Sequence, residues 1–352
     1  MTNGRSRSSG RPTLDQVAAR AGVARATASR VLNGSAQVSD ASRELVEQAA
    51  ADLGYIPNVA ARSLVTHRTD SIALVAFEPE RRVFGDPWFA RVIRGVSGVL
   101  GSTDLHLWIA FAQSAAERAR IGYYLTGDHV DGVLLLSLHH SDPLPHVLSQ
   151  RGLPTVVAGR SLTAEASAAG YTHTGPDLTN YVDIDDAGGA RLAVRHLLAT
   201  GRRRIAMIAG PQHLGFCVAR LRGYREALAQ ARIPLDPDLV AYGDLSDDSG
   251  ALAARRLLET RPDIDGIVAG SDAMAAGALR GLRGWRSVPE QVSVVGFDNS
   301  LLAQHTVPAL TTVDVPAEEM GRQMASVLID AIAGAAPIGI VLDTHLIRRH
   351  SA

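Results

Sequence analysis

Four charged side chains stand just after strand-like apolar runs. A guanidinium or a carboxylate can hold two neighbouring hydroxyl groups at once, which is the chemistry needed to bind a polyol. Ligands of open α/β sheets bind at the carboxyl ends of the strands, so two facing lobes would bring such residues together. For any one of them alone, a solvated charge at a loop end is the plainer interpretation. The four are Arg160 after "TVVAG", Arg220 past "MIAGP", Asp272 after "IVAGS" and Asp298 after "VSVVGF".

Aromatic side chains near the same runs supply a second part of such a site. An aromatic ring can cover the apolar face of a sugar, while the polar groups fix its orientation. Core packing is the competing interpretation for each ring. The candidates are Phe77, Trp88, Phe89 and Phe216.

A further set of candidate residues lies on one face of a short helix near the N-terminus, predicted between about Ala24 and Leu32. Val31 and Leu32, with the small Ala28, mark its inward face. A guanidinium fits the O6 and N7 acceptors of guanine, and hydroxyl groups suit phosphate oxygens. A solvated face of a helical hairpin is the alternative. The outward face predicted to contact DNA holds Arg25, Ala26, Thr27, Ser29 and Arg30.

The charge distribution favours a polyanionic partner for this end of the chain. Residues 1–68 hold nine arginines and five acidic residues, a net charge of +4. The remainder holds 26 arginines against 31 acidic residues, a net charge of −5. A basic segment on a mildly acidic body is typical of nucleic-acid binding. Compositional bias is the alternative, because every cation of the chain is an arginine.

Three short helices must position the basic face. "TLDQVAARAGV" opens with a capping box of Thr13 and Gln16, and Gly22 ends the first helix. "NG" at 33–34 ends the second, and a third runs from about Ser39 to Gly54. Two helices joined by a short Gly-containing turn and braced by a third make a helix-turn-helix. The expected apolar face of the third helix comprises Leu45, Val46, Ala49, Ala50 and Leu53.

The rest of the chain alternates strand-like and helix-like segments. Continuous apolar runs such as "SIALVAF", "VDGVLLLSL", "RIAMIAG" and "VSVVGFD" are typical of buried parallel strands. The alternation restarts at "NYVDID", which indicates two successive doubly wound α/β lobes. Our boundaries are 1–11 for a disordered basic arm, 12–57 for the head, 58–68 for a hinge helix and linker, 69–165 plus 314–337 for an N-terminal lobe, and 166–313 plus 338–350 for a C-terminal lobe.

The segment "NVAARSL", residues 58–64, predicts a helix that is marginal by itself. One or two turns fall well short of the ~12–15 residues that an isolated helix needs in water. Asn58 can cap it, but Leu64 has no apolar partner nearby. A helix of this kind can fold only on its target, with the cost of ordering met by the contacts made there.

The head, "TLDQVAARAGVARATASRVLNG" followed by "VSDASRELVEQAAADLGYIPNVAARSL", closely resembles the DNA-binding head of the lactose/galactose-repressor (LacI/GalR) family of bacterial transcription regulators. The resemblance implies that Arg25 and Ala26 are specificity residues, that Arg30 contacts a base and that Thr27 and Ser29 contact phosphate. It also implies that Leu64 wedges into the minor groove, with Ala61 allowing close approach and Arg62 near the backbone. Thr13, Asn33, Tyr55 and Asn58 complete the implied DNA-binding set. Ala24 stands where the family often has a capping Ser, and Ala28 where it has Val.

The body resembles the effector domain of the same family through "HLLATGRRRIAMIAGP", "RLRGYREAL", "GSDAMAAGALRGL", "VSVVGFDN" and "PALTTVDVP". That domain is similar to periplasmic sugar-binding proteins. The resemblance implies that Arg220 and Asp298 hold the effector and that Trp88 stacks on it. Ser271–Asp272 replaces the common Asn-Asp, which puts one amide contact in doubt. We therefore expect a dimer on pseudo-palindromic operator DNA with a central CG step, and an effector that is a sugar or, as the alternative, a purine.

Other classes of protein fit less well. The "HHSDP" loop, with His139, His140 and Asp142, reads better as a polar loop than as a metal site, and no nucleophile elbow or phosphate loop is present. The single Cys217 has no motif around it. A secreted solute-binding protein would fit the body but would need a signal peptide in place of the head. We expect no catalytic residues, no metal and no cofactor, and a cytoplasmic location.

Overall fold

The computed structural model describes residues 12–32, 37–56, 68–138, 142–160 and 180–352. The chain forms two compact units, a head over residues 1–69 and a body over 70–352. Predictions for the arm at 1–11 and for Asn33, Asn58, Ala61, Arg62 and Leu64 fall outside the described ranges. Within those ranges, no helix is long and apolar enough to cross a bilayer.

The head consists of α1 (Leu14–Ala21), α2 (Arg25–Leu32) and α3 (Asp40–Leu53), as predicted. The Thr13 side chain accepts from the Gln16 backbone amide, and the Gln16 side chain accepts from the Thr13 amide, so the capping box is confirmed. Gly22 follows α1 with φ 67°, in the left-handed region that glycine adopts most readily. The turn that sets the angle between α1 and α2 therefore follows from local sequence.

A small apolar core holds these helices together. It is built from Val17, Ala18, Ala21, Ala28, Val31, Val46, Ala49 and Ala50. The prediction for Leu45 was wrong, because this side chain is 55% exposed. The buried face of α3 follows the spacing of Val46, Ala49, Ala50 and the partly buried Leu53, and Leu45 lies beside that stripe.

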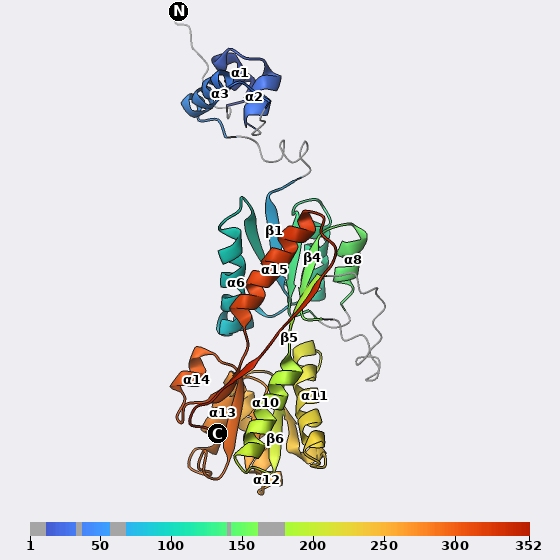
Figure 1. Cartoon of the computed structure of the whole chain (residues 1–352), viewed down its shortest axis with the longest axis vertical. Helices are drawn as coiled ribbons and strands as arrows, with labels where there is room; N and C mark the ends of the chain where they lie inside the picture. Colours follow the sequence, from blue (N-terminus) through green and yellow to red (C-terminus); the bar gives the residue numbers. More distant parts are fainter. Residues whose placement is uncertain (1–11, 33–36, 57–67, 139–141, 161–179) are drawn as a thin grey trace, which may run out of the picture. The chain divides into compact units, whose positions relative to one another are not determined.

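The body contains two six-stranded sheets, which we call lobe 1 and lobe 2 with the helices that cover them (Figure 1). In spatial order, the sheet of lobe 1 comprises β11 (Gly339–Leu342), β5 (Asn180–Ile184), β4 (Thr155–Ala158), β3 (Gly132–Leu136), β1 (Ser71–Ala76) and β2 (His106–Phe111), all parallel. The sheet of lobe 2 comprises β12 (His345–Ile347), β10 (Thr311–Asp314), β9 (Ser293–Asp298), β8 (Gly266–Ala269), β6 (Ile205–Ala209) and β7 (Val240–Tyr242). Among the described strands of that sheet, β10 pairs with β12 in antiparallel fashion and the other pairings are parallel.

Helices cover both faces of each sheet. Lobe 1 carries α5 (Glu80–Gly85), α6 (Pro87–Leu100), α7 (Ala115–Leu125), α8 (Leu144–Gln150) and α15 (Ala317–Ile332). Lobe 2 carries α10 (Asp186–Ala199), α11 (Gly215–Gln230), α12 (Asp247–Thr260), α13 (Asp272–Leu282) and α14 (Leu301–His305), with the 3₁₀ turn η1 (Pro237–Leu239). In β1, Ile72 and Leu74 join the core under α6 and α15, whereas Ala73 and Val75 join the core under α7 and α8. The doubly wound α/β prediction is confirmed.

Two parts of the predicted lobe boundaries are wrong. β5, which contains "NYVDI", pairs with β4 and belongs to lobe 1, although the restart of the alternation there predicts the beginning of lobe 2. β11 pairs with β5 and also belongs to lobe 1, although the predicted boundaries place 338–350 in lobe 2. A strand's apolar pattern does not say which sheet it joins. The chain therefore passes between the lobes after β5, after β10 and after β11.

Candidate functional site

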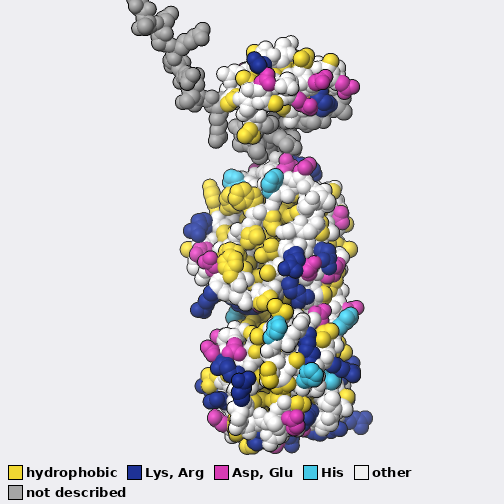
Figure 2. Space-filling view, turned by 90° about the vertical axis from the view of Figure 1, so that its left-hand side faces the viewer, with side chains coloured by type: hydrophobic (Ala, Val, Ile, Leu, Met, Phe, Trp, Pro, Cys, Tyr) yellow, Lys and Arg dark blue, Asp and Glu magenta, His cyan; other side chains and the backbone are white. Residues whose placement is uncertain are grey.

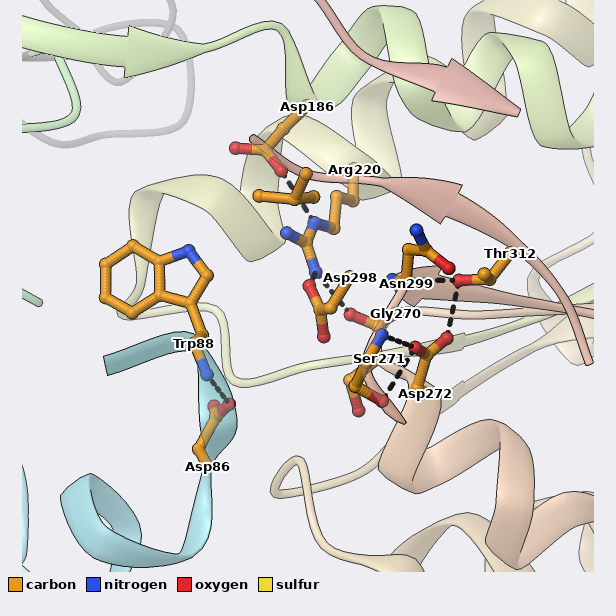
Figure 3. Close-up of polar contacts among 12 residues, drawn as sticks. Asp86, Trp88, Asp186, Arg220, Gly270, Ser271, Asp272, Asp298, Asn299 and Thr312 are labelled. Carbon is orange, nitrogen blue, oxygen red and sulfur yellow. Dashed lines mark hydrogen bonds and ion pairs between the residues drawn. The ribbon is translucent and has the colours of Figure 1, made fainter. Parts of the chain in front are cut away.

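Arg220 lies at the centre of a buried polar cluster at the carboxyl ends of the lobe 2 strands (Figure 3). Its Nε donates to Oδ1 of Asp186 at 2.7 Å, and its Nη1 donates to the Gly270 carbonyl at 2.7 Å and to Oδ1 of Asp298 at 3.2 Å. These partners come from the start of α10 and from the ends of β8 and β9. Among the described residues nothing accepts from its Nη2, so that amino group is left for a ligand.

Aromatic rings and two carboxylates stabilise the buried guanidinium. Its carbon lies 3.9 Å from the ring centre of Phe297 and 4.9 Å from that of Phe216. Burial opposes the charged form, but the carboxylates of Asp186 and Asp298 outweigh it and raise the pKa of Arg220. Burial in turn raises the pKa of both aspartates, although Arg220 pulls in the opposite direction. One cation thus balances two buried acids.

Asp298 ends β9 in a strained conformation that aims its carboxylate at Arg220. Its φ is 104° and that of Asn299 is 47°, both in the region that non-glycine residues rarely adopt. The side chain is 20% exposed. In the described part of the chain its Oδ2 accepts no hydrogen bond, so this oxygen can accept one from a ligand. Arg220 and Asp298 together therefore present a free donor group and a free acceptor.

Asp272 and Ser271 serve the structure of lobe 2. Asp272 is 1% exposed; its Oδ2 accepts from the Ser300 amide and hydroxyl, and its Oδ1 accepts from Thr312 at 2.5 Å. Burial raises its pKa to about 6. Ser271 is the N-cap of α13 and accepts from the Met274 amide. Through these hydrogen bonds, Asp272 connects Ser300, in the turn after β9, to Thr312 on β10. Asp298 lies at the start of the same turn.

Arg160 comes from lobe 1, at the carboxyl end of β4. Its Nε lies 2.7 Å from Oδ2 of Asp183 on the neighbouring strand β5. Burial is the main reason that the pKa of Asp183 rises to about 6, and the nearby Asp186 adds to the effect. The Arg160 side chain is 41% exposed, and its Nε is held by Asp183.

The four candidate aromatics separate into two kinds. Phe77 and Phe89 are buried core residues, 3% and 1% exposed, and the ring of Phe77 lies beneath Arg118. Trp88 and Phe216 are half-buried. Asp86 caps α6 by accepting from the Trp88 amide, and Figure 3 shows the indole of Trp88 on the side of the cluster away from Asp272 and Thr312.

Three residues around this cluster were missed from the sequence. Asp183 and Asp186 lie in "VDIDD", whose pattern indicates only a strand and a helix start, although acids at a strand end resemble the signal that identified Asp298. Arg91 on α6 reaches across from lobe 1 to the Asp298 carbonyl. No local pattern marks Arg91, because its partners are more than two hundred residues away.

The "HHSDP" loop is described only in part. Asp142 accepts from Arg118 at 3.0 Å and from the Leu144 amide at 2.9 Å. His139 and His140 lie outside the described residues, and within the described ones no three metal-binding side chains gather.

In the head, the residues predicted to meet DNA lie on one outward face of α2. Arg25, Ala26 and Arg30 are exposed, and Thr27 and Ser29 are half-buried. Arg25 lies 3.1 Å from Asp15 in a pair whose two side chains are each 70% exposed, so it is weakly held. Thr13 caps α1, where a hydroxyl and backbone amides can meet a phosphate. Tyr55 packs against the head core.

Comparison with known proteins agrees with both units. Residues 13–58 match the model of the bacterial regulatory proteins of the lacI family, and residues 194–352 match the periplasmic binding protein-like domain. Over 344 residues the chain is 49% identical to the HTH-type transcriptional regulator CelR of Thermobifida fusca, covering 97% of this chain and 98% of that one. It is 34% identical to the transcriptional repressor CytR of Escherichia coli K12 over 328 residues, covering 92% and 90%.

Solved structures agree as well. A CelR–cellobiose complex aligns with a TM-score of 0.75 at 48% identity, over 97% of this chain and 100% of that one. A Lac repressor dimer bound to operator and an anti-inducer shares the fold, with a TM-score of 0.81 at 24% identity over 97% and 99%. With a helix-turn-helix head, a two-lobed body and relatives matched over nearly their whole length, the chain belongs to the LacI family and is a DNA-binding transcriptional regulator.

Proposed function

We propose that this regulator responds to a neutral oligosaccharide, with cellobiose as the first candidate. The observation that carries the proposal is the Arg220–Asp298 pair, in which, among the described residues, Nη2 of Arg220 and Oδ2 of Asp298 have no hydrogen-bond partner. Two adjacent hydroxyl groups complement this pair, one accepting and one donating. Trp88 supplies an aromatic face from lobe 1. The similarity to a regulator solved with cellobiose supports the same class of ligand.

The charges of the cluster favour a neutral ligand over an anionic one. Asp183, Asp186 and Asp298 face two arginines, Arg160 and Arg220, and both arginines already contact these acids. A phosphorylated sugar would add negative charge where carboxylates already exceed cations, in a site of low dielectric. A purine, the alternative ligand, can stack on Trp88 and can also meet a donor and an acceptor with its ring edge, so the titration described below distinguishes the two.

The head supports sequence-specific binding to double-stranded operator DNA. We assign base contacts to Arg25 and Arg30, phosphate contacts to Thr27 and Ser29, and a minor-groove wedge to Leu64. Replacing Arg30 with Ala should relax base preference as well as weaken binding. The test is operator selection from a random pool followed by fluorescence anisotropy on the selected and scrambled duplexes. An equal loss on both duplexes would assign Arg30 to phosphate contact alone.

The surface of lobe 1 supports a homodimer, which a pseudo-palindromic operator requires. Figure 2 shows hydrophobic side chains gathered on the face of lobe 1 where α6 lies in Figure 1. β2 is an edge strand of its sheet, and Trp108 and Ile109 on it are 58% and 41% exposed. Phe84 on α5 is 72% exposed and stacks edge-on against Phe111. Exposed apolar side chains on an unpaired edge are typical of an interface.

The ligand is tested by titration calorimetry of the full chain with cellobiose, glucose, glucose 6-phosphate and adenine. We expect saturable binding of cellobiose that is at least tenfold tighter than that of the phosphorylated sugar. Tighter binding of glucose 6-phosphate or adenine than of cellobiose would overturn the assignment.

Replacing Asp298 with Ala separates the two activities. We expect operator binding to be retained and the response to cellobiose to fall at least 100-fold in apparent affinity, because the variant lacks the acceptor and leaves Arg220 unbalanced on that side. Operator affinity measured by anisotropy against cellobiose concentration gives both values. A variant that responds like the wild type would remove Asp298 from the site.

A further inference from the structure

Arg91 is a lobe 1 side chain that hydrogen-bonds to lobe 2 and to the segment between the lobes. It lies on α6, one turn beyond Trp88. Its Nη1 donates to the Asp298 carbonyl at 3.1 Å, and its Nη2 donates to the Val315 carbonyl at 3.1 Å. Val315 lies between β10 of lobe 2 and α15 of lobe 1, where the chain passes between the lobes. The Arg91 guanidinium therefore links α6 both to Asp298 and to the segment that runs from β10 to α15.

The peptide that Arg91 contacts is the strained one. Asp298 and Asn299 both have positive φ, and such conformations cost about 1–3 kcal/mol each for ordinary residues. On the far side of the turn, lobe 2 holds Asn299 through Asp314 at 2.8 Å and through Arg349 at 2.7 Å. Arg91 holds the near side from the other lobe. A change in the direction of the Asp298 carbonyl is therefore opposed by a group on α6.

α6 is coupled to the rest of lobe 1. It packs closely against α15, since a Cβ on Gly95 would lie 2.0 Å from the Glu318 carbonyl oxygen and one on Gly321 would lie 2.1 Å from that of Val92. Figure 1 shows the two helices side by side. Interlocked backbones of this kind move together rather than slide. A force on Arg91 is thus carried into lobe 1, whose first strand, β1, directly follows the segment from the head.

We propose that Arg91 is a positioning residue that transmits effector binding from Asp298 to lobe 1. It touches the backbone of Asp298 and leaves the effector-binding atoms free. In one arrangement of the lobes, the hydrogen bonds of Arg91 hold the left-handed turn in which the Asp298 carboxylate meets Arg220. A ligand that hydrogen-bonds to that carboxylate shifts the residue and so changes the geometry of the bond between the Asp298 carbonyl and Arg91. This inference rests on the proposed function, because it assigns the effector to Asp298 and Arg220.

The test compares full-length Arg91→Met with Arg94→Met. Methionine keeps most of the apolar stem and removes the donors. Arg94 is the matched control. It lies on the same helix, its side chain is 72% exposed, and its ion pair with Glu318 is long, at 3.9 Å. The measurement is the ratio of operator dissociation constants with and without saturating cellobiose. We expect this ratio to fall at least fivefold in Arg91→Met, with ligand-free operator affinity within twofold of wild type, and to stay unchanged in Arg94→Met.

Arg91→Lys keeps the charge but cannot donate to two carbonyls in a planar fork. It should fall between wild type and Arg91→Met. A full response in Arg91→Met, or an equal loss in Arg94→Met, overturns the inference.

A second measurement requires no ligand and separates this inference from the choice of effector. If wild type does not respond to cellobiose, the proposed ligand is wrong, and amide hydrogen exchange on the ligand-free proteins decides about Arg91. We expect faster exchange over residues 299–303 and at the start of α15 in Arg91→Met than in Arg94→Met, at unchanged melting temperature. Equal exchange in the two variants would refute the coupling.

Discussion

The buried Arg220 couples the stability of lobe 2 to its chemistry. Arg220 and Asp186 are each 5% exposed in their side chains and lie 2.7 Å apart. Both groups were removed from water on folding, so neither can lose its partner without leaving an uncompensated buried charge. The same bond orients the guanidinium so that its Nη1 donates to Oδ1 of Asp298. On the proposed function, stability and ligand binding therefore depend on one ion pair.

Replacing Arg220 with Met should destabilise the protein by about 3–5 kcal/mol, since it strands the Asp186 carboxylate in the interior. Urea unfolding followed by circular dichroism measures this. The control is Arg191→Met, which breaks partly exposed pairs with Glu226 at 2.6 Å and with Asp185 at 3.5 Å and should cost no more than about 1 kcal/mol. Equal losses in the two variants would mean that burial does not set the difference.

Asp183 should make stability fall as pH rises. Burial raises its folded-state pKa to about 6 from 3.8, so between these values the folded state binds more protons than the unfolded state. Stability is then lost as pH rises through that window and is flat above it. Asp183→Asn lacks this titration, so its stability relative to wild type should increase from pH 4 to pH 6.5 by up to about 3 kcal/mol. Urea midpoints across that range check it; a constant difference, or one of opposite sign, would contradict it.

At the scale of elements, the pairing of α6 with α15 depends on two glycines. Gly95 and Gly321 allow backbone to lie against backbone, whereas a Cβ added at the nearby Gly98 on α6 would have nothing within 4 Å. Glycine is otherwise unfavourable inside a helix. The close contact explains why Gly95 stands there, and it is the contact through which Arg91 can act on lobe 1.

Gly95→Ala should destabilise the body by about 1–3 kcal/mol or more, because the added methyl group meets backbone atoms that cannot turn away. Gly98→Ala, three residues further along the same helix, should instead stabilise it by up to about 1 kcal/mol through helix propensity alone. Thermal unfolding of the two variants and the wild type distinguishes these signs. Equal destabilisation by both substitutions would mean that the close backbone approach at Gly95 does not set the difference.

At the scale of the whole molecule, the head and the body perform different tasks and must communicate through the segment between them. The described residues include the face of α2 proposed to contact DNA and the cluster proposed to bind the effector. Leu64 lies outside them, so its role rests on the sequence resemblance. A ligand can alter operator affinity only if it binds the two arrangements of the dimer differently.

Leu64→Ala should weaken the specific operator complex at least tenfold while changing non-specific DNA binding by less than threefold, since an apolar wedge acts only where the duplex is kinked. Anisotropy titrations on the selected operator and on a scrambled duplex at one salt concentration measure both. A parallel loss on both duplexes would reduce the segment to a linker.

Local sequence determined the head and the type of most body elements. Capping residues and glycines act within one turn of the chain, so the boundaries of α1 and α3 followed from Thr13, Gly22, Ser39 and Gly54. Likewise, apolar runs gave buried strands, and charged residues at their ends correctly marked Arg220 and Asp298 as neighbours. The helical spacing of apolar residues could not decide whether Leu45 is buried. Leu45 lies at the margin of the apolar stripe, and only the packing of the other helices determines where the buried face ends.

Tertiary structure alone decided which sheet each strand joins and what the site residues do. β5 and β11 entered lobe 1 because strand pairing depends on partners far along the chain. The same long-range contacts made Asp272 a structural acid, gave Arg220 the partner Asp186 and brought Arg91 to the Asp298 carbonyl. A sequence can show that a side chain is able to bind a ligand. Whether its polar atoms are free to do so depends on which distant groups already satisfy them.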